Sequence, residues 1–147
     1  MNEAYIGIKR LTDTAKMPTT AHITDAGYDL YADEAVKITP GNRQVVRTSI
    51  TMNIPSGFCG LIWPRSGMAV KQGTDIFGGV IDAGYQGELM VCLHNADERK
   101  NIQVLRGDRI AQIVIHELPK VVLNDLTDLG PDEDTERSTS GFGSTGS

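Results

Sequence analysis

Apolar side chains along this chain mostly alternate with polar ones, and the alternation recurs in short runs. These runs are Ile6 and Ile8; Val36 and Ile38; Ile50, Met52 and Ile54; Leu89, Val91 and Leu93; Ile102 and Val104; Ile113 and Ile115. A period of two places every second side chain on one face of a β-strand. Turn-forming segments such as Pro40-Gly41-Asn42 and Arg106-Gly107-Asp108 separate the runs. We therefore predict an all-β sandwich or barrel of short antiparallel strands.

Four segments depart from this alternation. Residues Ser66 to Gly73 predict one short helix, with Ser66 as the N-cap and Gly73 just after the last turn. The continuous apolar runs Leu61-Ile62-Trp63 and Val121-Val122-Leu123 are typical of strands that are buried on both faces. From Gly130 onward the chain is rich in Ser, Thr, Gly and acidic residues, which indicates a flexible C-terminal arm (130–147) beyond a β core (1–129).

Length and charge narrow the class of protein. A chain of 147 residues is one domain by size. Its net charge of −5 argues against a nucleic-acid polymer as partner, but not against a small anion held by a few arginines. Cys59 and Cys92 stand singly in apolar stretches, as reduced thiols do. Because neither a signal peptide nor a membrane-spanning stretch is evident, we expect a soluble cytoplasmic protein.

Several polar residues are candidates for chemistry. Arg65, Ser66 and Gly67 stand at the start of the predicted helix, where backbone N–H groups and a guanidinium suit a phosphate; the alternative is a capped helix with a surface arginine. Asp29 and Asp82 each lie among glycines and apolar residues. Such a carboxylate caps a turn, binds a metal, or serves as a general base.

Two further segments carry polar groups in unusual settings. Residues 106–112 place charges at a turn and one amide, Gln112, on an apolar strand; a hairpin with an internal ion pair is the alternative. Residues 141–146 fit the pattern G-x-G-x-x-G, but a dinucleotide fold requires this pattern between a strand and a helix, so we exclude that fold. The glycines nonetheless suit phosphate oxygens, and Phe142 suits stacking on a base.

Taken in order, these five segments resemble the trimeric deoxyuridine triphosphatase (dUTPase) family, from about Asp25 to the C-terminus. The resemblance implies a distorted jelly roll, or β-clip barrel, that assembles as a homotrimer with active sites between subunits. It also implies hydrolysis of dUTP to dUMP and pyrophosphate with Mg²⁺, which limits uracil in DNA and supplies dUMP for dTMP synthesis.

The resemblance further implies a role for each residue of the site. Asp82 would be the general base, Asp29 would hold waters of the magnesium ion, and Tyr85 would pack under the deoxyribose and exclude a 2′-hydroxyl. A hairpin from Gly79 to Met90 would receive the nucleoside. The substrate-binding residues implied are Arg65, Ser66, Gly67 and Gln112 at the phosphates, Gly79, Val80, Ile81, Tyr85 and Met90 at the nucleoside, and Arg137, Phe142, Gly143, Ser144 and Thr145 in the arm.

Two other functions are compatible with the same predicted fold. A dCTP deaminase-like enzyme would need a glutamate in the nucleoside pocket, where Glu88 is the only one nearby. A nucleotide-sensing or protein-binding module would keep the fold without turnover. Gly84 and Gln86 depart from the family pattern, in which an acidic residue and an arginine are frequent at these positions.

Overall fold

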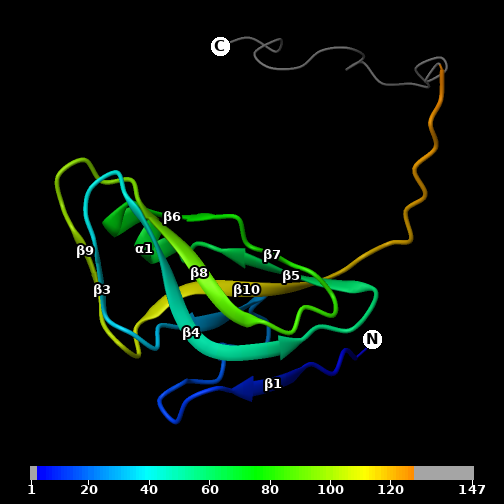
Figure 1. The fold of residues 1–147 in the computed structure, drawn as a ribbon, viewed down its shortest axis with the longest axis horizontal. Coiled ribbons are helices and arrows are strands. Elements are labelled where there is room, and N and C mark those ends of the chain that lie inside the picture. Colours follow the sequence, from blue (N-terminus) through cyan, green and yellow to red (C-terminus); the bar gives the residue numbers. More distant parts are fainter. Residues whose placement is uncertain (1–2, 128–147) are drawn as a thin grey trace.

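The computed structural model describes residues 3–127, which form two four-stranded sheets, one two-stranded sheet and one helix (Figure 1). The first sheet has the order β1 (Gly7–Arg10), β4 (Arg43–Asn53), β8 (Glu88–Asn95), β6 (Thr74–Phe77). The second has the order β2 (Gly27–Tyr31), β10 (Arg109–Glu117), β5 (Phe58–Trp63), β7 (Val80–Ile81). Strands β3 (Val36–Ile38) and β9 (Ile102–Val104) form the third sheet. The described strand pairs are antiparallel, so the all-β prediction is confirmed.

The core follows the predicted alternation. In β8, Leu89, Val91 and Leu93 are fully buried, whereas Met90 between them is 44% exposed. The other predicted runs also lie in strands or at their ends, and they supply most of one continuous apolar core. Because the buried residues stand at every second position, each sheet presents one apolar face to the core.

The helix α1 (Ser66–Gln72) confirms the prediction in all but its first residue. Its N-cap is Arg65, with extended backbone and no side-chain cap, so the prediction of Ser66 as the N-cap is wrong. Gly73 ends the helix in the left-handed conformation, and its N–H faces the carbonyls of Met68 and Ala69. Position 73 thus requires a glycine-like backbone, as the sequence indicated.

Strand β4 is irregular where it passes the start of β8. Its register shifts between Arg47 and Thr51, and the buried Ser49 has a φ of 53°. This conformation aims the Ser49 N–H at Glu88 Oε1, at 2.8 Å. Glu88 also pairs with Arg47, at 3.2 Å, and the pair raises the pKa of the arginine. The first residue of β8 is therefore held by two contacts from β4.

Two predictions about apolar segments are wrong. Val121, Val122 and Leu123 are between 68% and 91% exposed and belong to no strand; the chain after β10 extends away from the sheets (Figure 1). In β5, Ile62 is buried, Leu61 is half-buried and Trp63 is 55% exposed, so the run from Leu61 to Trp63 is not buried on both faces. A continuous apolar run does not distinguish these cases from a strand inside the core. No helix within residues 3–127 is long and apolar enough to cross a bilayer.

Candidate functional site

A polar pocket of about 340 Å³ lies where β2, β10 and the start of α1 meet. It brings together the predicted residues Asp29, Arg65, Ser66, Gly67 and Gln112. It adds residues that were not predicted, and these are Thr20, Ala21, Asp25, Ala26, Gly27 and Arg109. Segments that are distant in the sequence thus form one concave surface rich in charge.

Asp29 stands between two arginines in this pocket. Arg65 Nε donates to Asp29 Oδ1 at 2.8 Å, and Arg109 Nη1 donates to Asp29 Oδ2 at 3.4 Å. The three side chains carry a formal charge of +1 together. Since α1 has only seven residues, the two guanidinium groups supply most of the positive charge at its start. The pocket is suited to an anion larger than one carboxylate.

Gln112 is fixed by its neighbours on both sides. It pairs in register with Asp29 of β2 and with Trp63 of β5, and its Nε2 donates to the carbonyl of Pro64 at 3.0 Å. Its side chain lies over Gly27, where an added Cβ would overlap Oε1 and stand 3.0 Å from Cδ. Gly27 therefore provides the space that lets Gln112 hold the residue before Arg65.

Arg109 was missed by the sequence analysis for a geometric reason. In a regular strand, residues 109 and 112 point to opposite faces. Here the register of β10 against β2 shifts between Arg109 and Ala111, and both Ile110 and Ala111 are buried. This bulge re-aims Arg109 so that it lines the same pocket as Gln112. The strand pattern alone carries no signal for the bulge.

The turn before Arg109 is anchored to Asp33, and not by an ion pair of its own. Arg106 Nε donates to the Asp33 carbonyl at 3.0 Å, whereas Asp108 accepts from the Leu105 N–H at 2.8 Å. The alternative of an internal ion pair at this turn is therefore wrong. Burial would raise the pKa of Asp33, but hydrogen bonds, first that from Thr12, and the Arg106 charge hold it below its usual value.

Asp82 and Tyr85 lie together at a second place, the turn after β7. The Tyr85 N–H donates to the Asp82 carbonyl at 3.2 Å, and Gly84 has a φ of 79°. A positive φ at the third position is what a type II turn requires, so glycine suits position 84. Both Asp82 and Tyr85 are exposed. The turn thus presents a carboxylate and an aromatic ring to solvent, three positions apart in the sequence.

The predicted hairpin from Gly79 to Met90 is wrong in its pairing. Strand β7 pairs with β5 and strand β8 pairs with β4 and β6, so the turn passes from one sheet to the other. The predicted residues around it have different settings. The Gly79 carbonyl accepts from Ile62 N at 2.8 Å, Ile81 pairs with Gly60, and Val80 and Met90 are exposed.

Within residues 3–127 of one chain, no hydrogen bond or ion pair joins Asp82 or Tyr85 to the polar pocket. The two groups of predicted residues are therefore two separate surfaces of a single chain. Arg137, Phe142, Gly143, Ser144 and Thr145 lie outside the described residues.

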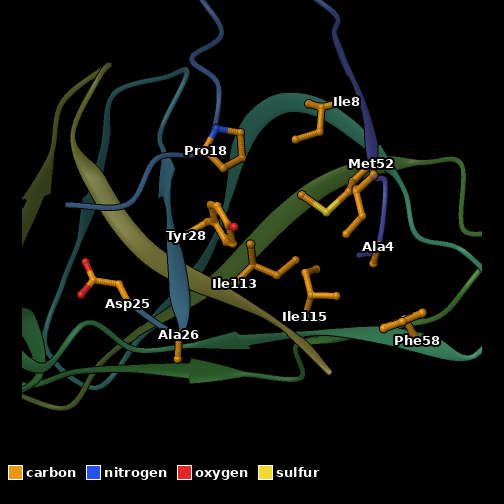
Figure 2. A pocket seen from close by; sticks show the side chains of 11 residues that line it. Ala4, Ile8, Pro18, Asp25, Ala26, Tyr28, Met52, Phe58, Ile113 and Ile115 are labelled. Atoms are coloured by element: carbon orange, nitrogen blue, oxygen red, sulfur yellow. The ribbon is translucent and has the colours of Figure 1, made fainter. Parts of the chain in front are cut away.

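A larger hollow, of about 510 Å³, lies between β1, β2 and β10 and is mainly apolar. Figure 2 shows Met52, Ile113 and Ile115 in its middle, with the Asp25 carboxylate set apart from them at one side. Asp25 is already occupied, because it accepts from the N–H groups of Ala21 and His22 at 3.1 and 2.9 Å. The hollow therefore offers no chemistry comparable to that of the polar pocket.

The described residues contain no cluster of three or more His, Cys, Asp or Glu side chains that could enclose a metal ion. The polar pocket instead offers Asp29 beside the arginines, whereas its second carboxylate, Asp25, accepts from the N–H groups of Ala21 and His22. Mg²⁺ commonly binds through one or two carboxylates together with substrate phosphates and keeps several waters. Asp29 fits that mode of binding, and it does not fit a site built from protein ligands alone.

Comparison with known proteins agrees with this geometry. The dUTPase family profile matches residues 13–146. Deoxyuridine 5'-triphosphate nucleotidohydrolase of Corynebacterium glutamicum is 46% identical over 145 residues, covering 97% of this chain and 95% of the relative. The enzyme of the same name from Rhodococcus erythropolis is 46% identical over 143 residues, covering 96% of this chain and 85% of the relative.

Solved structures show the same likeness. The dUTPase of Staphylococcus bacteriophage 80alpha with dUpNHpp has a TM-score of 0.86 at 31% identity, covering 97% of this chain and 99% of that chain. A mutant dUTPase from phage phi11 of S. aureus, described with a structural Mg(II) ion, has a TM-score of 0.80 at 29% identity. The match covers 86% of this chain and 99% of that chain. These neighbours confirm the expected jelly-roll fold. The chain therefore belongs to the dUTPase family of nucleotide hydrolases.

Proposed function

We propose that this protein hydrolyses dUTP to dUMP and pyrophosphate. The observation that carries the proposal is the polar pocket, in which two arginines flank Asp29 next to Ser66, Gly67 and Gln112. The names of the relatives and their match along nearly the whole chain support it.

The polar pocket is proposed to hold the triphosphate. Arg65 uses Nε for Asp29 and Arg109 uses Nη1, so each guanidinium has further N–H donors for phosphate oxygens. Gln112 supplies an amide close by, and Ser66 and Gly67 supply the first N–H groups of α1. We extend the predicted set of phosphate-binding residues by Arg109 on this geometry.

Asp29 would hold Mg²⁺ through water, since both of its oxygens already accept from arginines. A bound Mg²⁺ would neutralise the charge that develops on the phosphate chain. The two arginines would orient the phosphates and offset the remaining negative charge.

The turn after β7 is proposed to hold the nucleoside and the base. Asp82 would take a proton from water, whose oxygen bonds to the α-phosphorus while the bond to the pyrophosphate oxygen breaks. Main-chain groups of Gly79, Val80 and Ile81 would pair with the uracil edge beside Met90, and Tyr85 would pack under the deoxyribose.

The separation of the two surfaces favours a site shared between copies of the chain. Within the described residues, both carboxylates of the polar pocket already accept hydrogen bonds, Asp29 from two arginines and Asp25 from two backbone N–H groups. No residue from Asp82 to Tyr85 is an arginine or a lysine. We propose that these surfaces meet in a homotrimer, whose third contribution is the arm with Arg137, Phe142, Gly143, Ser144 and Thr145. The arm would clamp the outer phosphates and cover the base.

Glu88 does not suit the acid of a deaminase. Its carboxylate accepts from the Ser49 N–H at 2.8 Å and from Arg47 Nε at 3.2 and 3.3 Å. A carboxylate that accepts several hydrogen bonds has few lone pairs left for a substrate. This contact set favours hydrolysis of the triphosphate over deamination of cytosine.

The experiment that tests the proposed base is Asp82→Asn, with the exposed loop residue changed in Asp13→Asn as a control for the lost charge. We expect kcat for dUTP to fall by about 10²- to 10⁴-fold in Asp82→Asn, with nucleotide binding retained. Asp13→Asn should keep the activity of the unmodified protein. Near-normal kcat in Asp82→Asn would show that another group activates the water.

A further inference from the structure

The ring of Tyr85 lies directly over Gly87. A Cβ added to Gly87 would overlap the Tyr85 hydroxyl oxygen and stand 2.5 Å from Cζ and 3.0 Å from Cε2. The backbone of Gly87 is not left-handed, in contrast to that of Gly84. What position 87 requires is therefore space for the ring and not an unusual backbone conformation.

A hydrogen bond holds the ring at its far end. Tyr85 Oη donates to the carbonyl of Glu88 at 3.1 Å. The Tyr85 N–H is held at the same time by the Asp82 carbonyl. The side chain is thus fixed at its backbone and at its hydroxyl, and one ring face lies against Gly87. Because the residue is still 42% exposed, the ring remains accessible to a ligand.

Glu88 connects this arrangement to the rigid part of the fold. Its carboxylate is held by Ser49 and Arg47 of β4, and the next residue, Leu89, is fully buried. A carbonyl anchored in this way does not shift easily, so it fixes where the Tyr85 hydroxyl lies.

We propose that Gly87 and the Glu88 carbonyl are positioning elements for Tyr85, and that they make its ring a rigid barrier against the 2′-hydroxyl of a ribonucleotide. The inference rests on the proposed function and names what sets its sugar specificity. Rejection of one extra hydroxyl by contact requires a wall that does not move by about 1 Å, since such a displacement makes room for the oxygen. A ring held at three points meets this requirement.

The test is Gly87→Ala, which pushes the ring aside without straining the backbone. We measure kcat/KM for dUTP and for UTP and take the ratio as the sugar selectivity. We expect the ratio to fall by at least about 10-fold in Gly87→Ala, with most of the change in UTP use. Gly7→Ala is the control, because there the added Cβ makes only an ordinary contact at 3.8 Å.

A double-mutant cycle with Tyr85→Ala separates positioning from a general loss of structure. If Gly87 acts through the ring, Gly87→Ala changes nothing more once Tyr85 is alanine. Tyr85→Phe, which removes only the bond to Glu88, should lower the ratio by less than Gly87→Ala, and it serves as the test if Gly87→Ala does not fold. An unchanged selectivity ratio in a folded Gly87→Ala variant overturns the inference. If Gly87→Ala does not fold, an unchanged ratio in Tyr85→Phe overturns it. Additive effects of Gly87→Ala and Tyr85→Ala in the double-mutant cycle also overturn it.

The failure of the proposed function is distinguishable from the failure of this inference. An unmodified protein that leaves dUTP intact contradicts the function itself. If the unmodified protein prefers dUTP over UTP and the Gly87→Ala and Tyr85→Phe variants show the same preference, only the role of Gly87 and Glu88 is contradicted.

Discussion

Replacing Arg109 with alanine tests the part of the site that only the structure reveals. Its contact with Asp29 is 3.4 Å long and its side chain is 51% exposed, whereas Arg65 makes a 2.8 Å contact and is 28% exposed. An exposed ion pair contributes about 0–1 kcal/mol to folding, so the variant should unfold close to the temperature of the unmodified protein. A charge-assisted hydrogen bond to phosphate contributes about 1.5–3 kcal/mol, which corresponds to about 10- to 150-fold in kcat/KM.

The assay is steady-state hydrolysis of dUTP with Mg²⁺, together with thermal unfolding of the same samples. Arg99→Ala is the matched control, because Arg99 is an exposed arginine in the loop after β8 and outside the polar pocket. We expect a selective loss in Arg109→Ala, greatest for the triphosphate and small for dUMP binding. Unchanged kcat/KM, or an equal loss in Arg99→Ala, would refute the reasoning that the bulge in β10 aims Arg109 at the substrate.

Two further predictions concern Gly27, which lines the polar pocket, and Asp33, which anchors the turn before Arg109. Gly27→Ala should displace Gln112 and lower kcat/KM by about 10-fold while the fold persists, with Gly7→Ala as control; full activity would show that Gln112 finds another position. The lowered pKa of Asp33 means that its ionised form stabilises the fold above the unfolded value of about 3.9, and that this stability is lost as the pH falls through the lower folded pKa. The decline of the unfolding temperature between about pH 5 and pH 2 should therefore be less steep in Asp33→Asn, and equal slopes would contradict it.

Much of the fold follows from the alternation of apolar residues. Runs such as Leu89, Val91 and Leu93 predict strands correctly because a sheet with one buried face requires a period of two. The same logic fails for Val121 to Leu123, whose continuous apolar pattern carries no information on what covers it. The pairing of β7 and β8 in different sheets was equally out of reach, since a short turn between two strands is the usual mark of a hairpin.

The residues of the candidate site also fall into those that the sequence predicts and those that it does not. Asp29, Arg65 and Gln112 were predicted and do line one pocket, because neighbouring strands bring them together. Arg109 was not predicted, because a bulge changes the face of the strand on which a residue lies, and the alternation of apolar residues in the sequence does not reveal the bulge. The importance of Gly87 was also hidden, because it depends on where the Tyr85 ring lies. Such close approaches depend on tertiary structure.

Identification of the products formed from four nucleotides tests the central claim most directly. The purified protein is incubated with Mg²⁺ and with dUTP, dCTP, dTTP or UTP, and the products are separated by ion-exchange chromatography. The account predicts dUMP and pyrophosphate in equal amounts from dUTP, and little or no product from the other three. Ammonia from dCTP, single phosphate from dUTP, or intact dUTP after prolonged incubation would contradict it.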